Sequence, residues 1–85
     1  MLKIREGVDL KELEKFGFRA KYDEDSGKIK SYAYKHERID VKKRLIPFYR
    51  DYNEYSEIDR EYYSSEMVEV LYDLIQANLV EKVSE

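Results

Sequence analysis

The sequence predicts an α+β fold, with a short N-terminal helix, an antiparallel sheet of three to four strands, and a long C-terminal helix packed on one sheet face. Three observations support this prediction. Residues 65–79 have the 3.6-residue apolar period of a helix, residues 9–17 carry the boundary signals of a shorter helix, and residues 18–35 alternate around a polar turn. Eighty-five residues suffice for one core, so we expect a single domain spanning residues 1–85.

A short edge strand is expected at residues 1–5, followed by the N-terminal helix. Asp9 suits the N-cap, and Glu12 three residues later completes an acidic capping box. Gly17 can adopt the left-handed conformation that ends a helix. The side expected to be buried consists of Leu10, Leu13 and Phe16.

Residues 18–22 and 28–35 predict a hairpin around the turn DEDSG at residues 23–27. Alternation gives two expected faces. The core face would hold Phe18, Ala20, Tyr22, Ile29, Ser31 and Ala33. The opposite face would hold Arg19, Lys21, Lys30, Tyr32 and Tyr34. Residues 39–50 predict one or two further strands, and Pro47 places its strand at an edge or breaks it, because proline has no amide to donate.

The C-terminal helix has the clearest pattern in the chain. Ser64 or Ser65 can cap its first turn, and Asn78 suits a left-handed residue at its end. Its apolar residues span an arc of about 160°, which we expect to be core: Met67, Val68, Val70, Leu71, Leu74 and Ile75. The opposite side is acidic and is expected to extend a negative surface. Val80 to Val83 can form a last short strand.

The net charge of −3 conceals a marked asymmetry along the chain. Residues 1–50 carry 14 Lys/Arg and 9 Asp/Glu, whereas residues 51–85 carry 2 and 10. Charged residues make up 41% of the chain, against a norm of about 25%. This segregation predicts two oppositely charged surfaces or complementary halves.

The sequence lacks the residues that several classes of function require. It has no cysteine, no apolar run long enough to span a membrane and no signal-peptide pattern, so we expect a cytoplasmic protein without membrane contact. DEDSG resembles the start of a calcium loop, but Gly27 falls at position 5 and Tyr34 at position 12, where glycine at 6 and glutamate at 12 are needed. We expect neither a metal site nor a cofactor.

Enzymatic activity is also not expected. His36 is the only histidine, and Glu37 beside it could orient a base. No nucleophile motif, glycine-rich phosphate loop or second histidine accompanies this pair.

An acidic, tyrosine-rich segment spans residues 51–64, with little periodicity. We expect a crossing segment, with at most one helical turn at residues 57–62. Tyrosine is enriched at interface hot spots, and carboxylates steer a surface toward a basic partner. The candidate partner-binding residues are Tyr52, Glu54, Tyr55, Glu57, Asp59 and Tyr62. The alternative is that these rings cover the core while the acids face water.

A second candidate function is nucleic-acid binding by a basic, tyrosine-bearing sheet face, as in proteins that stack bases on a sheet. The residues of this alternative are Arg19, Lys21, Lys30, Tyr32, Tyr34, Lys42 and Arg44. The acidic C-terminal half weakens this interpretation, since it would repel phosphates.

Four stretches together carry a resemblance to a known group of proteins: DLKELEKFGF, the Lys/Tyr-rich hairpin, RLIPFY and LYDLIQANLVEKV. The chain resembles, over nearly its whole length, small proteins encoded by phages and prophages of Gram-positive bacteria. The shared motifs are structural and imply no catalytic residues. The resemblance implies a cytoplasmic accessory protein that modulates a phage or host macromolecule by binding. We therefore expect a protein partner, with the chain itself a monomer or a homodimer.

Overall fold

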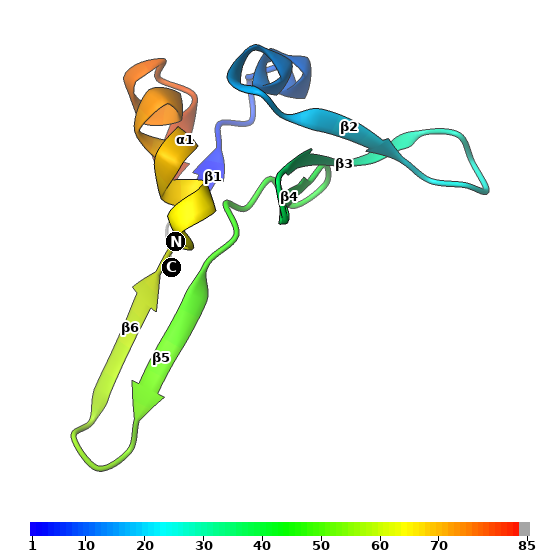
Figure 1. Ribbon diagram of the computed structural model, residues 1–85. Helices are drawn as coiled ribbons and strands as arrows, with labels where there is room; N and C mark the ends of the chain where they lie inside the picture. The colour runs from blue at the N-terminus through cyan, green and yellow to red at the C-terminus, as the bar shows by residue number, and fades with distance from the viewer. Residues whose placement is uncertain (84–85) are drawn as a thin grey trace.

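The computed structural model describes residues 1–83, which form seven strands, one 3-10 helix and one α-helix (Figure 1). The α+β class and the antiparallel pairing are confirmed. The arrangement of the strands differs from the prediction, because the strands form three small sheets rather than one sheet of three to four strands. No single broad sheet face therefore exists for the long helix to cover.

The first sheet joins the two ends of the described chain. β1 (Leu2–Ile4) pairs antiparallel with β7 (Val80–Lys82), so both predicted terminal strands are confirmed. On its other side β1 is hydrogen-bonded to residues 44–46: the Ile4 amide donates to the Arg44 carbonyl and the Ile46 amide to the Leu2 carbonyl, both at 2.9 Å. Because β1 is enclosed on both sides, Ile4 is fully buried.

The second sheet has the order β2 (Arg19–Tyr22), β3 (Ile29–Tyr34) and β4 (Glu37–Asp40). Ala20, Tyr32 and Ile39 are direct neighbours across the three strands and face the core. The predicted orientation of β3 is therefore wrong for Tyr32, which is 4% exposed. The cause is a register shift between Lys21 and Tyr22. Such an irregularity breaks the strict alternation on which the prediction depended.

The third sheet is a hairpin of β5 (Tyr49–Asn53) and β6 (Ile58–Tyr62), which projects away from the rest of the molecule (Figure 1). We call residues 49–62 the arm. The expectation of a crossing segment with at most one helical turn at residues 57–62 is wrong, because residues 58–62 form β6. Residues 45–48, around Pro47, lie between β4 and β5 and form no strand beyond one isolated bridge from Leu45 to Lys3.

The short helix η1 (Leu10–Phe16) is a 3-10 helix, a form that proteins use in short pieces. Its predicted ends are confirmed: the Asp9 carboxylate accepts from the Lys11 amide at 3.0 Å, and Gly17 has a φ of 93°. The capping box is incomplete, since the Glu12 carboxylate instead accepts from Lys15 Nζ at 2.7 Å.

The long helix α1 spans Ser65–Gln76. Ser64 caps it by accepting from the Met67 amide at 3.1 Å. At the other end Asn78 has a φ of 62°, and the Leu79 amide donates to the Leu74 carbonyl. Both predicted helix ends are confirmed.

The core lies where α1, η1, β1 and β4 meet. Six large side chains at its centre are fully buried: Ile4, Leu13, Ile39, Ile46, Met67 and Leu74. Only part of the apolar arc of α1 contributes. Val68 and Ile75 are 56% and 48% exposed, contrary to prediction, because the small sheets do not reach across the whole arc.

Candidate partner-binding arm

The arm is built by a turn that the sequence specifies locally. The Asn53 side-chain oxygen accepts from the amides of Tyr55 at 2.9 Å and Ser56 at 3.3 Å. This side-chain turn is typical of asparagine, and Glu57 completes it with a φ of 54°. β5 and β6 then pair in a continuous register from Asn53 opposite Ile58 to Tyr49 opposite Tyr62.

Both faces of the arm are open to solvent. Nine of its ten strand residues are exposed, and only Glu61 is partly covered. Tyr52 is 65% exposed, Tyr55 at the turn is 94% exposed, and Ile58 is 51% exposed. A two-stranded hairpin without a buried face is only marginally stable in water. The arm is thus a projecting element that the core does not cover.

Contacts between the two strands hold the arm together. Arg50 Nε lies 3.4 Å from Asp59, and Arg50 Nη2 lies 3.5 Å from Glu61. On the other face Arg60 lies 3.6 Å from Asp51. At the base the rings of Tyr49 and Tyr62 stack, with their centroids 5.6 Å apart. Exposed ion pairs of this kind contribute little stability, so the arm is weakly held.

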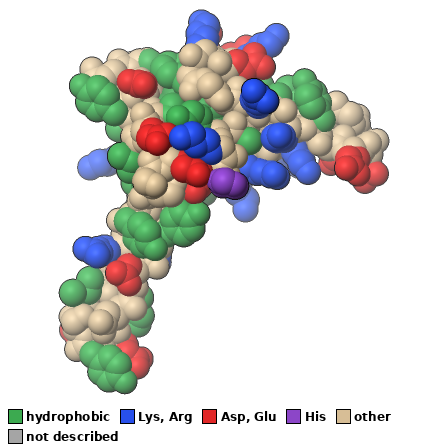
Figure 2. Space-filling view, in the orientation of Figure 1, with side chains coloured by type: hydrophobic (Ala, Val, Ile, Leu, Met, Phe, Trp, Pro, Cys, Tyr) green, Lys and Arg blue, Asp and Glu red, His purple; other side chains and the backbone are tan. Residues whose placement is uncertain are grey.

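The tip of the arm is negative and aromatic. The arm contains five acidic residues and two arginines, both of which are paired across the strands. Glu54 and Glu57 flank Tyr55 and form no ion pair within residues 1–83. Figure 2 shows mainly hydrophobic and acidic side chains on the arm, while basic side chains gather beside the β2–β4 sheet.

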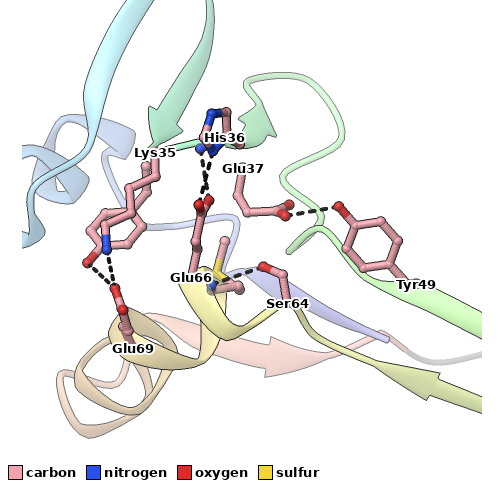
Figure 3. A network of polar contacts seen from close by, with 9 residues as sticks. Lys35, His36, Glu37, Tyr49, Ser64, Glu66 and Glu69 are labelled. Atoms are coloured by element: carbon pink, nitrogen blue, oxygen red, sulfur yellow. Dashed lines mark hydrogen bonds and ion pairs between the residues drawn. The ribbon is translucent and has the colours of Figure 1, made fainter.

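A hydrogen bond fastens the base of the arm to the second sheet. The Tyr49 hydroxyl donates to Glu37 Oε1 at 3.0 Å, and Glu37 is 6% exposed (Figure 3). The bond to this carboxylate raises the pKa of the Tyr49 phenol above its ordinary value. Glu37, which the sequence suggested as a partner of His36, therefore anchors the arm instead.

The β3–β4 turn is fastened to α1 by two acidic residues of the helix (Figure 3). Glu66 accepts from the His36 amide and lies 3.0 Å from His36 Nδ1, while Glu69 lies 2.6 Å from Lys35 Nζ. The hydrogen bond to Glu66 raises the pKa of His36, and the same contact lowers the pKa of Glu66. These two carboxylates are engaged within the molecule, so the expected negative surface along this side of α1 is reduced.

The structure places all the predicted partner-binding residues on the arm, although not on one face. Glu54, Tyr55 and Glu57 share the tip. Tyr52 and Asp59 are opposite each other on one face, and Tyr62 lies at the base on the other. The expectation that these rings could roof the core is wrong for Tyr52 and Tyr55, which are largely exposed.

The residues of the nucleic-acid alternative are scattered. Tyr32 is buried and offers no ring for stacking. The Tyr34 ring packs 5.4 Å from that of Phe18, and its hydroxyl donates to Glu69 at 3.2 Å. Arg44 Nη1 donates to the carbonyls of Arg5 and Val8, so this guanidinium has a structural role. The cations that stay exposed are Arg19, Lys21, Lys30 and Lys42.

An exposed apolar stripe on α1 was not predicted from the sequence. Val68, Tyr72 and Ile75 are 56%, 67% and 48% exposed and recur at the spacing of one helix side. The sequence signal for this stripe is the apolar arc of the helix, which is wider than the face of a small sheet.

Comparison of the chain with protein-family models, with curated proteins and with solved structures found no match. Neither helix within residues 1–83 has the length and apolar character needed to cross a membrane. Within the same range, no group of three or more acidic or histidine side chains is placed to hold a metal ion.

Proposed function

We propose that this chain is a non-enzymatic binding protein whose arm docks onto a basic surface of a protein partner. The proposal rests on one observation. The arm projects from the molecule as a hairpin that buries neither face, and its tyrosines are exposed (Figure 1). Ordering such an element costs conformational entropy that its own contacts barely offset. Docking against a partner would bury its rings and supply the missing contacts.

The chemistry of the tip supports a partner with a basic, partly apolar surface. Tyrosine provides a large contact area at low entropic cost, and such residues dominate interface energies. Glu54 and Glu57 beside Tyr55 would favour a surface with lysine or arginine around an apolar pocket. Under this proposal the partner is a cytoplasmic protein of a phage or its host, as the resemblance to phage-encoded proteins implies.

The test uses the full chain with a photo-crosslinking amino acid at position 55 and a lysate of the source organism. The crosslinked protein is identified, purified and titrated against three forms of the chain. Tyr52→Ala with Tyr55→Ala should weaken its affinity at least about tenfold, because two anchor rings are lost. Glu54→Gln with Glu57→Gln should weaken binding chiefly at low salt.

The matched control is Tyr22→Ala with Tyr72→Ala. These tyrosines are 58% and 67% exposed but lie outside the arm, so the control removes two exposed rings of similar accessibility. Its affinity should stay within about twofold of the parent chain, as expected for residues outside an interface. Equal binding by the arm variant and the parent, with both folded, would rule out the arm as the docking element.

A further inference from the structure

The lysines and arginines of this chain divide into paired and unpaired sets by region. Seven of the 16 form an ion pair within residues 1–83, and four of these lie on β1, η1 and the arm. Nine form none there, and seven of those nine fall between residues 19 and 43, on the β2–β4 sheet and its turns: Arg19, Lys21, Lys28, Lys30, Arg38, Lys42 and Lys43.

Two of these cations, Arg19 and Lys21, line a hollow on the outer face of the sheet, opposite the core. The register aligns Arg19, Ala33 and Arg38 across the three strands, and Lys21 follows Arg19 on the same face. The hollow has a volume of about 420 Å³ and is lined by Gly17, Arg19, Lys21, Ala33, Tyr34 and Lys35. Small side chains at positions 17 and 33 leave the space open, and its volume is within the range of small-molecule sites.

None of the residues within 1–83 that line this hollow carries a carboxylate. By register Asp40 lies on the same face, opposite Ser31, and its carboxylate already accepts from the amides of Lys42 and Lys43 at 2.9 Å. Lys35 is compensated by Glu69. Arg19 and Lys21 therefore hold like charges two residues apart on one face of β2, with Arg38 in line with Arg19 on the far side of Ala33. A bound anion would relieve their repulsion.

We propose that this hollow binds a small, multiply charged phosphate ligand, with Arg19 and Lys21 contacting the phosphate oxygens and Arg38 completing the site from β4. A guanidinium can hold two phosphate oxygens at once, and lysine adds a compact charge. A ligand with several charges matches several cations better than a monoanion does. This site is independent of the arm and of its protein partner.

A small ligand fits this face better than a nucleic-acid strand does. Binders of single strands combine cations with exposed rings that stack on the bases. Here Tyr34, which lines the hollow, has its ring packed near Phe18 and its hydroxyl bonded to Glu69. The one ring that lines the hollow within residues 1–83 is therefore already engaged inside the molecule.

The test titrates the ¹⁵N-labelled full chain with inorganic triphosphate at constant ionic strength and follows amide shifts by NMR. Saturable shifts are expected at Gly17, Arg19, Lys21, Ala33 and Arg38. Arg19→Gln with Lys21→Gln should weaken the affinity at least about tenfold, since two charge-assisted contacts are lost. Ala33→Leu should also abolish binding, because it fills the hollow without changing any charge.

The matched control is Lys11→Gln with Lys82→Gln. Both lysines are exposed and form no ion pair within residues 1–83, so the net charge changes equally while the hollow is untouched. This variant should bind within about twofold of the parent chain. If it weakens binding as much as the hollow variant does, or if the shifts never saturate, the specific site is refuted.

Two further ligands identify the source of the phosphate. Tighter binding of a nucleoside triphosphate than of triphosphate would support a nucleotide, and equal binding would support recognition of the phosphates alone. A single-stranded oligonucleotide that binds more tightly than either, with shifts spread over Lys28, Lys30 and Lys42, would overturn the proposal in favour of a nucleic-acid surface.

Discussion

The β2–β3 hairpin and the arm are both antiparallel hairpins rich in tyrosine and charge, yet only one of them belongs to the core. Tyr32 of β3 is 4% exposed, whereas Tyr52 of β5 is 65% exposed. β3 is enclosed by β2 and β4 and contributes Tyr32 to the core, while the arm projects away from the rest of residues 1–83 (Figure 1). A strand-forming sequence alone therefore does not create a buried face, because a third element must cover the hairpin.

The same two regions differ in how they use charge. In the arm both arginines are neutralised by acids on the facing strand, which leaves an acidic, aromatic tip. On the outer face of the β2–β4 sheet the cations stay without acidic partners within residues 1–83. The molecule thus presents two surfaces of opposite sign, and each suits a different class of ligand.

The largest expected effect comes from removing the same ring in the two regions. Tyr32→Ala should lower the free energy of unfolding by about 3 kcal/mol or more, because it leaves a cavity among Phe18, Ile39 and their neighbours. Tyr52→Ala should change it by less than about 0.5 kcal/mol, as for other exposed positions. Urea unfolding followed by circular dichroism measures both values.

If Tyr32→Ala and Tyr52→Ala lower the free energy of unfolding by similar amounts, the arm contributes to the core as much as β3 does. That result would contradict the difference in burial between the two hairpins. The variant Tyr32→Phe is also informative, because it keeps the ring and removes only the hydroxyl. It should destabilise far less than Tyr32→Ala if packing of the ring is what matters.

A smaller effect is expected where the two regions meet. Tyr49→Phe removes the hydroxyl that donates to the buried Glu37 and leaves that carboxylate without its partner. The midpoint of unfolding should fall, and amide exchange in β5 and β6 should become faster than in the parent chain. Amide exchange measured by NMR tests both regions at once.

Tyr62→Phe is the control, because it keeps the ring stack with Tyr49 and breaks no hydrogen bond to Glu37. Unchanged exchange in the arm of the Tyr49 variant would mean that other contacts fasten its base.

Local signals in the sequence predicted the parts of the fold that are decided locally. Ser64, Asn78, Asp9 and Gly17 act through backbone groups a few residues away, and the structure confirms each of them. The predicted orientation of β3 was wrong because the register shift beside Tyr22 depends on pairing between strands. No alternation within one strand reveals such a shift.

The candidate site was predicted in composition but not in shape. The sequence indicated an interface in the acidic tyrosine segment but not its two strands. Both faces of the arm are exposed, so its residues show no alternation of apolar and polar side chains. Without a buried face, a strand has no reason to alternate. The pairing of Glu66 with His36, 30 residues apart, likewise depends on tertiary structure that no local pattern encodes.

The smallest expected effect is a pH dependence at the contact between the β3–β4 turn and α1. The pKa of His36 is raised above its ordinary value of 6.5, chiefly by its hydrogen bond to Glu66 and then by the charge of that residue, with a further contribution from Glu37. The stability that His36 contributes is therefore present below pH 6.5 and is lost as the pH rises through the raised pKa. The pKa of Glu66 is lowered from 4.5, first by the same bond, so its contribution is present above pH 4.5 and is lost as the pH falls through the lowered pKa. The contact between His36 and Glu66 is therefore strongest between pH 4.5 and pH 6.5.

Glu66→Gln isolates this contact, because the amide oxygen can still accept from the His36 amide while the charge is gone. The pKa of His36, measured from its imidazole signals by NMR, should fall toward 6.5 in this variant. Glu24→Gln, on the distant β2–β3 turn, should leave that pKa unchanged. The His36 side chain is 92% exposed, so solvent screening keeps the shift and its effect on stability small. An identical His36 pKa in the parent chain and the Glu66 variant would show that the Glu66 charge does not act on the imidazole, which would contradict the prediction.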